Sequence, residues 1–136
     1  MTPEGVNPDE DPILKTLDAR REKLEQVRAR LMQHNFTGFV LVVVPERLPI
    51  EETARAAEIL AESNVNVCEI VVNRVLPADV DGDFYRSRRA QEQVYIDEIK
   101  RRFAAYPLAW VPQLPTDVYG LKNLEQVSAV LMGAPG

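Results

Sequence analysis

Apolar and polar residues along the chain alternate between the period of a helix and the continuous run of a buried strand. Between Ile13 and about His34, apolar side chains return at helical spacing among charged ones, which predicts an amphipathic helix with one buried stripe. The segment from Phe39 to Val44 is apolar throughout, which is typical of a parallel strand covered by helices on both faces. Pro45 ends this strand because proline has no N–H to donate to a ladder.

The rest of the chain repeats this alternation. The predicted elements are a helix from about Ile50 to the break at residues 62–66, a strand ending at Asn73, a charged helix from about Phe84 to Ala105, a strand from Leu108 to Val111, and a helix ending at Gly133. The charged helix is expected to bury Phe84, Ala90, Val94, Tyr95 or Ile96, Ile99 and Phe103. Strands that alternate with helices predict right-handed parallel crossovers and an α/β sheet of about three strands.

A length of 136 residues suits one ordinary domain. We expect a flexible N-terminal arm over residues 1–12, a single α/β domain over 13–133, and a tail over 134–136. Three parallel strands have two open edges, so the sheet either pairs with another copy or belongs to a wider sheet.

Composition and charge narrow the function classes. The formal net charge of −5 argues against a nucleic-acid partner. One cysteine and one histidine do not make a zinc site, and a single cysteine suits a reducing cytoplasm. No apolar stretch approaches the ~20 residues of a membrane span, so we expect a soluble cytoplasmic protein. Because the sequence offers no zinc ligand set, we also expect no bound metal.

Motifs for phosphate binding and catalysis are missing from the printed sequence. It contains neither Gly-x-x-x-x-Gly-Lys-Ser/Thr nor Gly-x-Gly-x-x-Gly, so we expect that the chain does not hydrolyse a nucleotide by itself. Neither His34 nor Cys68 has an evident partner for nucleophilic catalysis, and no catalytic residue is predicted.

Candidate ligand-binding residues lie at the carboxyl end of each predicted strand. Glu46 follows the first, Asn73 and Arg74 end the second, and Pro112, Gln113 and Leu114 follow the third, at the sheet edge where open α/β folds bind ligands. The amide of Asn73 donates and accepts at once, which matches the edge of adenine, and a proline-bounded loop offers a flat apolar wall. The alternative is that Asn73 only caps a turn before Pro77.

Several blocks of the sequence resemble one family. Residues 39–46, 48–53, 71–77 and 111–115, with Gly120 and Leu121, are similar in order and spacing to the C-terminal portion of the arsenite-pump and tail-anchored-protein-targeting ATPases. The helix that contains residues 86–91 and Tyr95 is similar to the prokaryotic branch, and the resemblance extends from about Asp11 to Leu131.

The resemblance implies part of a three-layer sandwich of the P-loop NTPase type, from an anion-transporting ATPase with a deviant Walker A motif that works as a dimer. It implies that Asn73 reads the adenine, that Pro112, Gln113 and Leu114 pack around the same base, and that Glu46 lies near the nucleotide. ATP or ADP with magnesium is the ligand of the full-length family. The family's phosphate loop, magnesium and switch residues and cargo-binding helical subdomain precede the portion represented here. Neither the paired cysteines of its zinc site nor its arsenite-binding cysteine triad has a counterpart in this sequence.

These observations leave three hypotheses. In the first, the chain is the adenine-recognition half of an arsenite-pump-type ATPase. This half is inactive unless the remainder is supplied, and it binds nucleotide weakly or not at all. Alternatively, it is an independent α/β interaction or dimerisation module without nucleotide chemistry. The third reading is a generic α/β domain whose resemblance reflects packing alone. The first hypothesis predicts that the chain forms a homo-oligomer or a complex with the N-terminal ATPase portion. A membrane protein is then expected only as an indirect partner. The residues that select the cargo lie outside this sequence.

Overall fold

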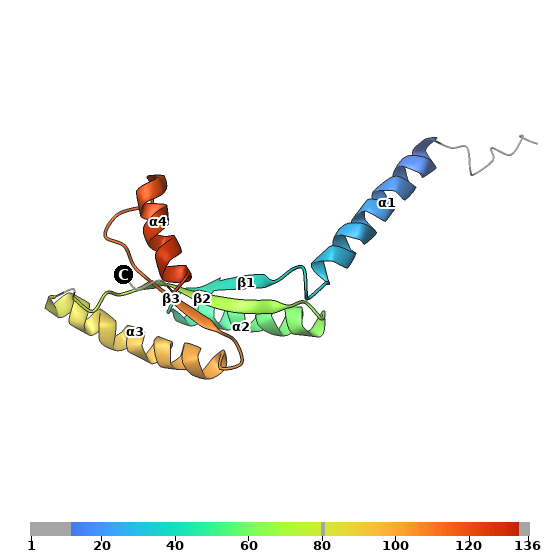
Figure 1. Ribbon diagram of the computed structural model, residues 1–136. Coiled ribbons are helices and arrows are strands. Elements are labelled where there is room, and N and C mark those ends of the chain that lie inside the picture. Colours follow the sequence, from blue (N-terminus) through green and yellow to red (C-terminus); the bar gives the residue numbers. More distant parts are fainter. Residues whose placement is uncertain (1–11, 80, 134–136) are drawn as a thin grey trace, which may run out of the picture. The chain divides into compact units, whose positions relative to one another are not determined.

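The computed structural model describes residues 12–79 and 81–133, so the predicted tail and all of the predicted arm except Pro12 lie outside the described residues. The chain divides into two compact units, Met1–Thr37 and Gly38–Gly136. The first unit contributes one helix, and the second contributes the sheet and the other helices (Figure 1).

Helix α1, Pro12–Leu31, is exposed along its whole length. Leu17 is 54 % exposed and Leu24 is 70 % exposed, so the prediction of a buried stripe was wrong for this helix. The periodic pattern predicted the helix correctly, but a stripe is buried only where another element packs on it. The helix ends in turns in which the Thr37 hydroxyl donates to the Arg30 carbonyl oxygen at 2.9 Å.

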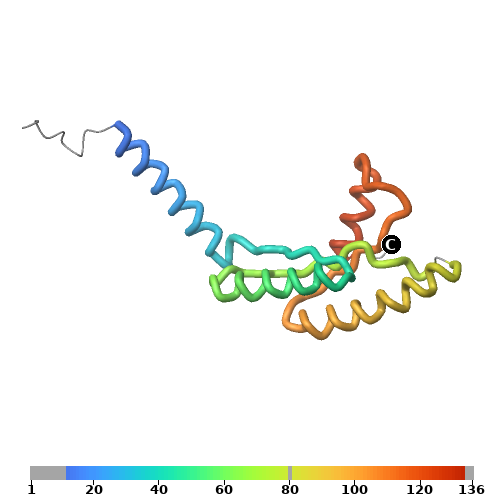
Figure 2. The backbone as a smooth tube through the Cα atoms, turned by 180° about the vertical axis from the view of Figure 1, so that it is seen from behind, coloured from blue at the N-terminus to red at the C-terminus, as the bar shows by residue number. Residues whose placement is uncertain are grey.

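The second unit is built on a parallel sheet in the order β1-β2-β3, from Phe39–Val43, Val67–Val75 and Leu108–Pro112. Three helices accompany the strands: α2 (Arg47–Glu62), α3 (Asp83–Arg102) and α4 (Gly120–Leu131). Helices α2 and α3 lie on one face of the sheet and α4 lies on the other, beside β3 (Figures 1 and 2). Because both crossovers step in the same direction, right-handed connections place α2 and α3 on the same face. The predicted α/β fold and three-layer arrangement are confirmed.

The core lies between the sheet and the α2–α3 layer. Its largest fully buried side chains are Phe103, Ile50, Ile70, Ile99, Val43 and Val72. At its margin Arg102 of α3 holds Glu51 of α2 by two contacts of 2.9 Å, one to each carboxylate oxygen. This paired geometry fixes the end of α3 against the start of α2.

On strand β1 and on helix α3, the predicted burial of some side chains differs from the structure. Val40 and Val42 of β1 are 48 % and 61 % exposed, so the prediction that helices cover both faces of this strand was wrong. On that side of the sheet, among the described residues, the helix packs on β3 rather than on β1.

In α3, Phe84 and Val94 are exposed, contrary to prediction, while Ile99 is buried as predicted. The buried side of the helix follows Ile99 and Tyr95 back to Glu92, in steps of four and three residues. None of the helices in the described part of the chain has the length and apolarity of a membrane span.

Candidate functional site at the carboxyl edge of the sheet

The carboxyl ends of the three strands bring the predicted polar residues to one edge of the sheet. Glu46 immediately precedes α2, Asn73 lies near the end of β2, and Gln113 immediately follows β3. Parallel strands end at the same edge, so this placement follows directly from the strand order.

Strand β2 carries a bulge at the predicted base-reading residue. Val72 pairs with Trp110 and Val75 pairs with Pro112, so Asn73 and Arg74 together lie opposite a single residue of β3. Arg74 has a φ of 61°, in the left-handed region, and its backbone N–H donates to Asn73 Oδ1 at 2.9 Å. Bulges reorient side chains next to binding sites. Sequence reasoning did not find this bulge, because arginine gives no signal for a left-handed conformation.

Asn73 lines a groove with the loop that follows β3. The groove measures about 710 Å³ and is lined by Asn73, Arg74, Val111, Pro112, Gln113, Leu114, Pro115, Thr116, Asp117, Val118 and Val127. Four of the five predicted site residues, all except Glu46, therefore share one groove. The lining combines apolar side chains such as Pro112 and Leu114 with polar ones such as Asn73. Small-molecule sites likewise combine apolar surface with polar groups that fix the orientation of the ligand.

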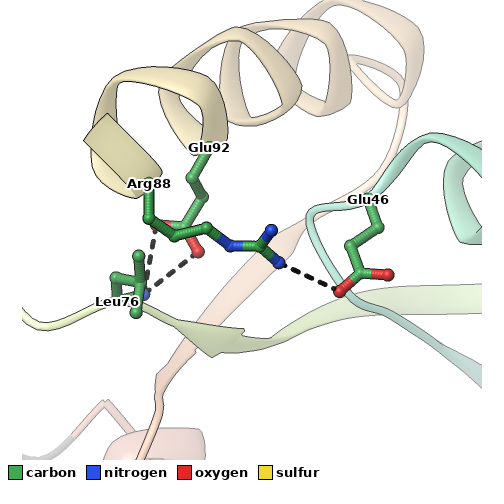
Figure 3. Close-up of polar contacts among 4 residues, drawn as sticks. All are labelled: Glu46, Leu76, Arg88 and Glu92. Carbon is green, nitrogen blue, oxygen red and sulfur yellow. Dashed lines mark hydrogen bonds and ion pairs between the residues drawn. The ribbon is translucent and has the colours of Figure 1, made fainter. Parts of the chain in front are cut away.

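Glu46 lies in a neighbouring pocket of about 210 Å³, to which Arg74 and Gln113 also belong. Its carboxylate makes no cap hydrogen bond to α2. Instead, Arg88 Nη2 of α3 approaches Glu46 Oε1 at 3.5 Å (Figure 3). Arg88 is therefore the partner of the acid for which the resemblance implies a position near the nucleotide.

The floor of this pocket contains a buried carboxylate that sequence reasoning missed. Glu92 is only 7 % exposed, and both of its oxygens accept from the Leu76 backbone N–H (Figure 3). Burial raises the pKa of the Glu92 carboxyl above its ordinary value, and the Leu76 hydrogen bond and the charges of Arg88 and Arg89 oppose this shift only in part.

Glu92 and Arg89 together fix the segment after β2. Arg89 Nη2 donates to the Pro77 carbonyl oxygen at 3.0 Å, one residue beyond the Leu76 contact. The helical spacing of Glu92 from Tyr95 and Ile99 was the available signal for its burial.

Among residues 12–79 and 81–133, no three His, Cys, Asp or Glu side chains lie close enough together to hold a metal ion. Cys68 is exposed at the opposite, amino end of β2, and its thiol donates to the Phe39 carbonyl oxygen at 3.3 Å.

Comparisons with known proteins agree with the resemblance of the sequence blocks. The family model described as anion-transporting ATPase matches residues 3–133. The chain is 31 % identical over 121 residues to ATPase GET3A of Arabidopsis thaliana, and 32 % identical over 122 residues to ATPase GET3 of Meyerozyma guilliermondii. Each alignment covers 88 % of this chain, but only 34 % and 35 % of the respective relative.

A third relative carries a different name. The chain is 34 % identical over 117 residues to a protein of Halobacterium salinarum named "Putative arsenical pump-driving ATPase". That alignment covers 85 % of this chain and 18 % of the relative. The chain thus spans about a third, or less, of the length of these curated relatives.

Proposed function

Because the chain belongs to the anion-transporting ATPase family, we propose that it forms the adenine-recognition part of an ATP site. The observation that supports the proposal is the shared groove in which Asn73 meets Pro112, Gln113 and Leu114. This groove lies at the sheet edge where open α/β folds bind ligands. Pro112 and Leu114 supply apolar surface for the ring, and Asn73 supplies the amide that distinguishes one base from another.

The hydrogen bond inside the bulge is compatible with this role. Asn73 Oδ1 accepts the Arg74 N–H with one lone pair, which leaves its second lone pair and both Nδ2 protons for a ligand. The side chain therefore stabilises the bulge and reads the base at the same time. Glu46, held by Arg88 in the adjoining pocket, lies near the nucleotide beyond the base.

Hydrolysis needs groups that this sequence does not supply. The sequence contains no phosphate-binding motif, so the chain alone does not hydrolyse ATP in our proposal. The complete site binds ATP or ADP with magnesium, in a homo-oligomer or together with the N-terminal ATPase portion, in the cytoplasm. Coupling of hydrolysis to transport or targeting belongs to that complete ATPase.

Titrating the ¹⁵N-labelled chain with adenosine, ADP and guanosine, followed by amide NMR, tests the proposal. We expect adenosine and ADP to bind with similar affinity, because the site contacts the base, and to shift the amides of Asn73, Gln113 and Leu114. Guanosine presents an acceptor where adenine presents its amino group, so it should bind more weakly.

Asn73→Ala should weaken adenosine binding about fivefold, since a hydrogen bond of the amide contributes on the order of 1 kcal/mol. Asn66→Ala is the matched control, because Asn66 immediately precedes the amino end of the same strand. Equal binding of guanosine, or an unchanged affinity in Asn73→Ala, would refute the assignment.

A further inference from the structure

Helix α3 contacts the backbone immediately after the β2 bulge with two charged side chains. Glu92 accepts the Leu76 N–H with both carboxylate oxygens, and Arg89 donates to the Pro77 carbonyl oxygen. Glu92 and Arg89 lie three residues apart, so they share one face of the helix. Among the residues that the structure describes, the lining of the groove that contains Asn73 includes neither of these side chains. They therefore act on the groove only through the backbone.

The peptide group between Val75 and Leu76 connects Glu92 to the loop that follows β3. Its N–H donates to Glu92, and its carbonyl oxygen accepts the Gln113 N–H at 2.8 Å. A peptide group is planar and rigid, so its N–H and its C=O do not reorient independently. The position of the Glu92 carboxylate therefore fixes the direction of the carbonyl group to which the Gln113 backbone is bonded.

The β2 bulge itself depends on contacts that hold its ends. The register with β3 shifts between Val72 and Val75, and Arg74 between them has a left-handed φ of 61°. A residue other than glycine keeps such a conformation only where the surrounding structure holds it. The contacts to Leu76 and Pro77 hold the chain on the carboxyl side of the bulge.

The burial of Glu92 has a cost that packing alone does not explain. The residue is 7 % exposed, and a buried carboxylate loses hydration that an apolar side chain at the same position would not have. Both of its oxygens are directed at one backbone N–H beside the candidate site. The carboxylate therefore serves the geometry of the segment that ends at this site.

We propose that Glu92 is a positioning residue for base recognition, which holds the β2 bulge and Gln113 through the Val75–Leu76 peptide group. The inference rests on the proposed function of the groove and adds a residue that does not contact the ligand. Without the carboxylate, the Leu76 N–H turns toward water, and the carbonyl group of the same peptide turns with it. The fraction of molecules with a binding-competent groove then falls, and the apparent affinity falls by the same factor.

Adenosine titrations of three variants, followed by amide NMR, test the proposal. Glu92→Ala removes the acceptor and should weaken adenosine binding about fivefold, the effect of losing about one hydrogen bond. Glu92→Gln keeps an acceptor oxygen and should bind adenosine within about twofold of the wild type. Ile99→Val is the matched control and should leave the affinity unchanged. Ile99 is fully buried on the same helix, and its loss of a methyl group lowers stability without removing a contact to Leu76.

Spectra of the variants without ligand supply a second readout. In Glu92→Ala the amides of Asn73, Arg74 and Gln113 should shift, whereas in Glu92→Gln they should keep their wild-type positions. Unchanged amides in Glu92→Ala, or a loss of affinity in Ile99→Val that equals the loss in Glu92→Ala, would overturn the proposal.

Two further outcomes are covered by this design. Should Glu92→Ala fail to fold, Glu92→Asp takes its place with the same expected results, because it withdraws the carboxylate by one methylene group. A wild type that does not bind adenosine would contradict the proposed function of the groove. The amide shifts of the ligand-free variants would still decide whether Glu92 positions Asn73 and Gln113.

Discussion

The Leu76 backbone N–H donates to both carboxylate oxygens of Glu92, at 3.2 and 3.1 Å, so α3 holds the residue that immediately follows β2. Burial raises the pKa of this carboxyl from its ordinary value of 4.5. A group whose pKa is raised by folding contributes stability that is complete below pH 4.5 and is lost as the pH rises through the folded pKa. The free energy of unfolding therefore depends on the charge of Glu92.

We expect Glu92→Gln to remove this dependence, because glutamine accepts the Leu76 hydrogen bond without a charge. As the pH rises above 4.5 and through the raised pKa of Glu92, the wild type should lose stability relative to Glu92→Gln. Urea denaturation at a series of pH values measures the difference between the two proteins.

Glu51 serves as a control because its contribution to stability should depend on pH in the opposite direction to that of Glu92. The hydrogen bond from Arg102 lowers the pKa of Glu51, so its contribution is present above its ordinary pKa of 4.5 and is lost as the pH falls through the lowered value. The stability of the wild type relative to Glu51→Gln should therefore fall with acidification. Parallel pH slopes for the two variants would contradict both assignments.

Val43 and Val42 are neighbours on β1 with opposite environments, 1 % and 61 % exposed. Val43→Ala should lower the free energy of unfolding by about 2–3 kcal/mol, because it removes buried methyl groups and leaves a cavity. Val42→Ala should cost less than about 1 kcal/mol. Denaturant midpoints at two protein concentrations measure both effects. A Val42→Ala cost that matches that of Val43→Ala, and grows with concentration, would mean that a second copy covers this face.

The sequence was sufficient to predict the strands and their parallel direction, because continuous β-branched runs separated by helical periods leave few other arrangements. It did not predict the exposure of Val42, since an apolar run does not say which element covers each face. Glu92 was missed for a related reason: a carboxylate within a charged helix is typical of a solvated face.

Within the candidate site, the placement of Asn73 and Gln113 at one edge followed from parallel strands ending together. Glu46 lies in the adjoining pocket, where it pairs with Arg88 of a helix that is distant in sequence. Contacts of this kind depend on how α3 packs and leave no local pattern in the sequence. The base-reading role of Asn73 stays a prediction.

Gly38 lies against Cys68 at the amino end of the sheet. A Cβ added to Gly38 would lie 2.9 Å from Cys68 Sγ and 3.3 Å from Cys68 Cβ. Gly38→Ala should therefore destabilise the fold by roughly 1–3 kcal/mol, as overpacking does.

Removing the Cys68 sulfur should restore most of the stability that Gly38→Ala loses. The double variant Gly38→Ala/Cys68→Ala is expected to be more stable than Gly38→Ala alone, and thermal unfolding of the four proteins of this cycle measures the coupling between the two residues. Additive effects would show that the contact is absent in solution.

Arg74 holds a φ of 61° inside the β2 bulge, a conformation that glycine adopts without strain. Arg74→Gly should therefore leave the free energy of unfolding unchanged or raise it by up to about 1 kcal/mol, and Arg74→Val should lower it by about 1–2 kcal/mol. The matched control is Arg55→Gly on the exposed side of α2, where glycine should cost about 1 kcal/mol. Urea unfolding of the three variants shows whether each substitution raises or lowers the free energy of unfolding. If Arg74→Gly is as destabilising as Arg55→Gly, Arg74 does not adopt the left-handed conformation in solution, and the bulge that presents Asn73 is not formed there.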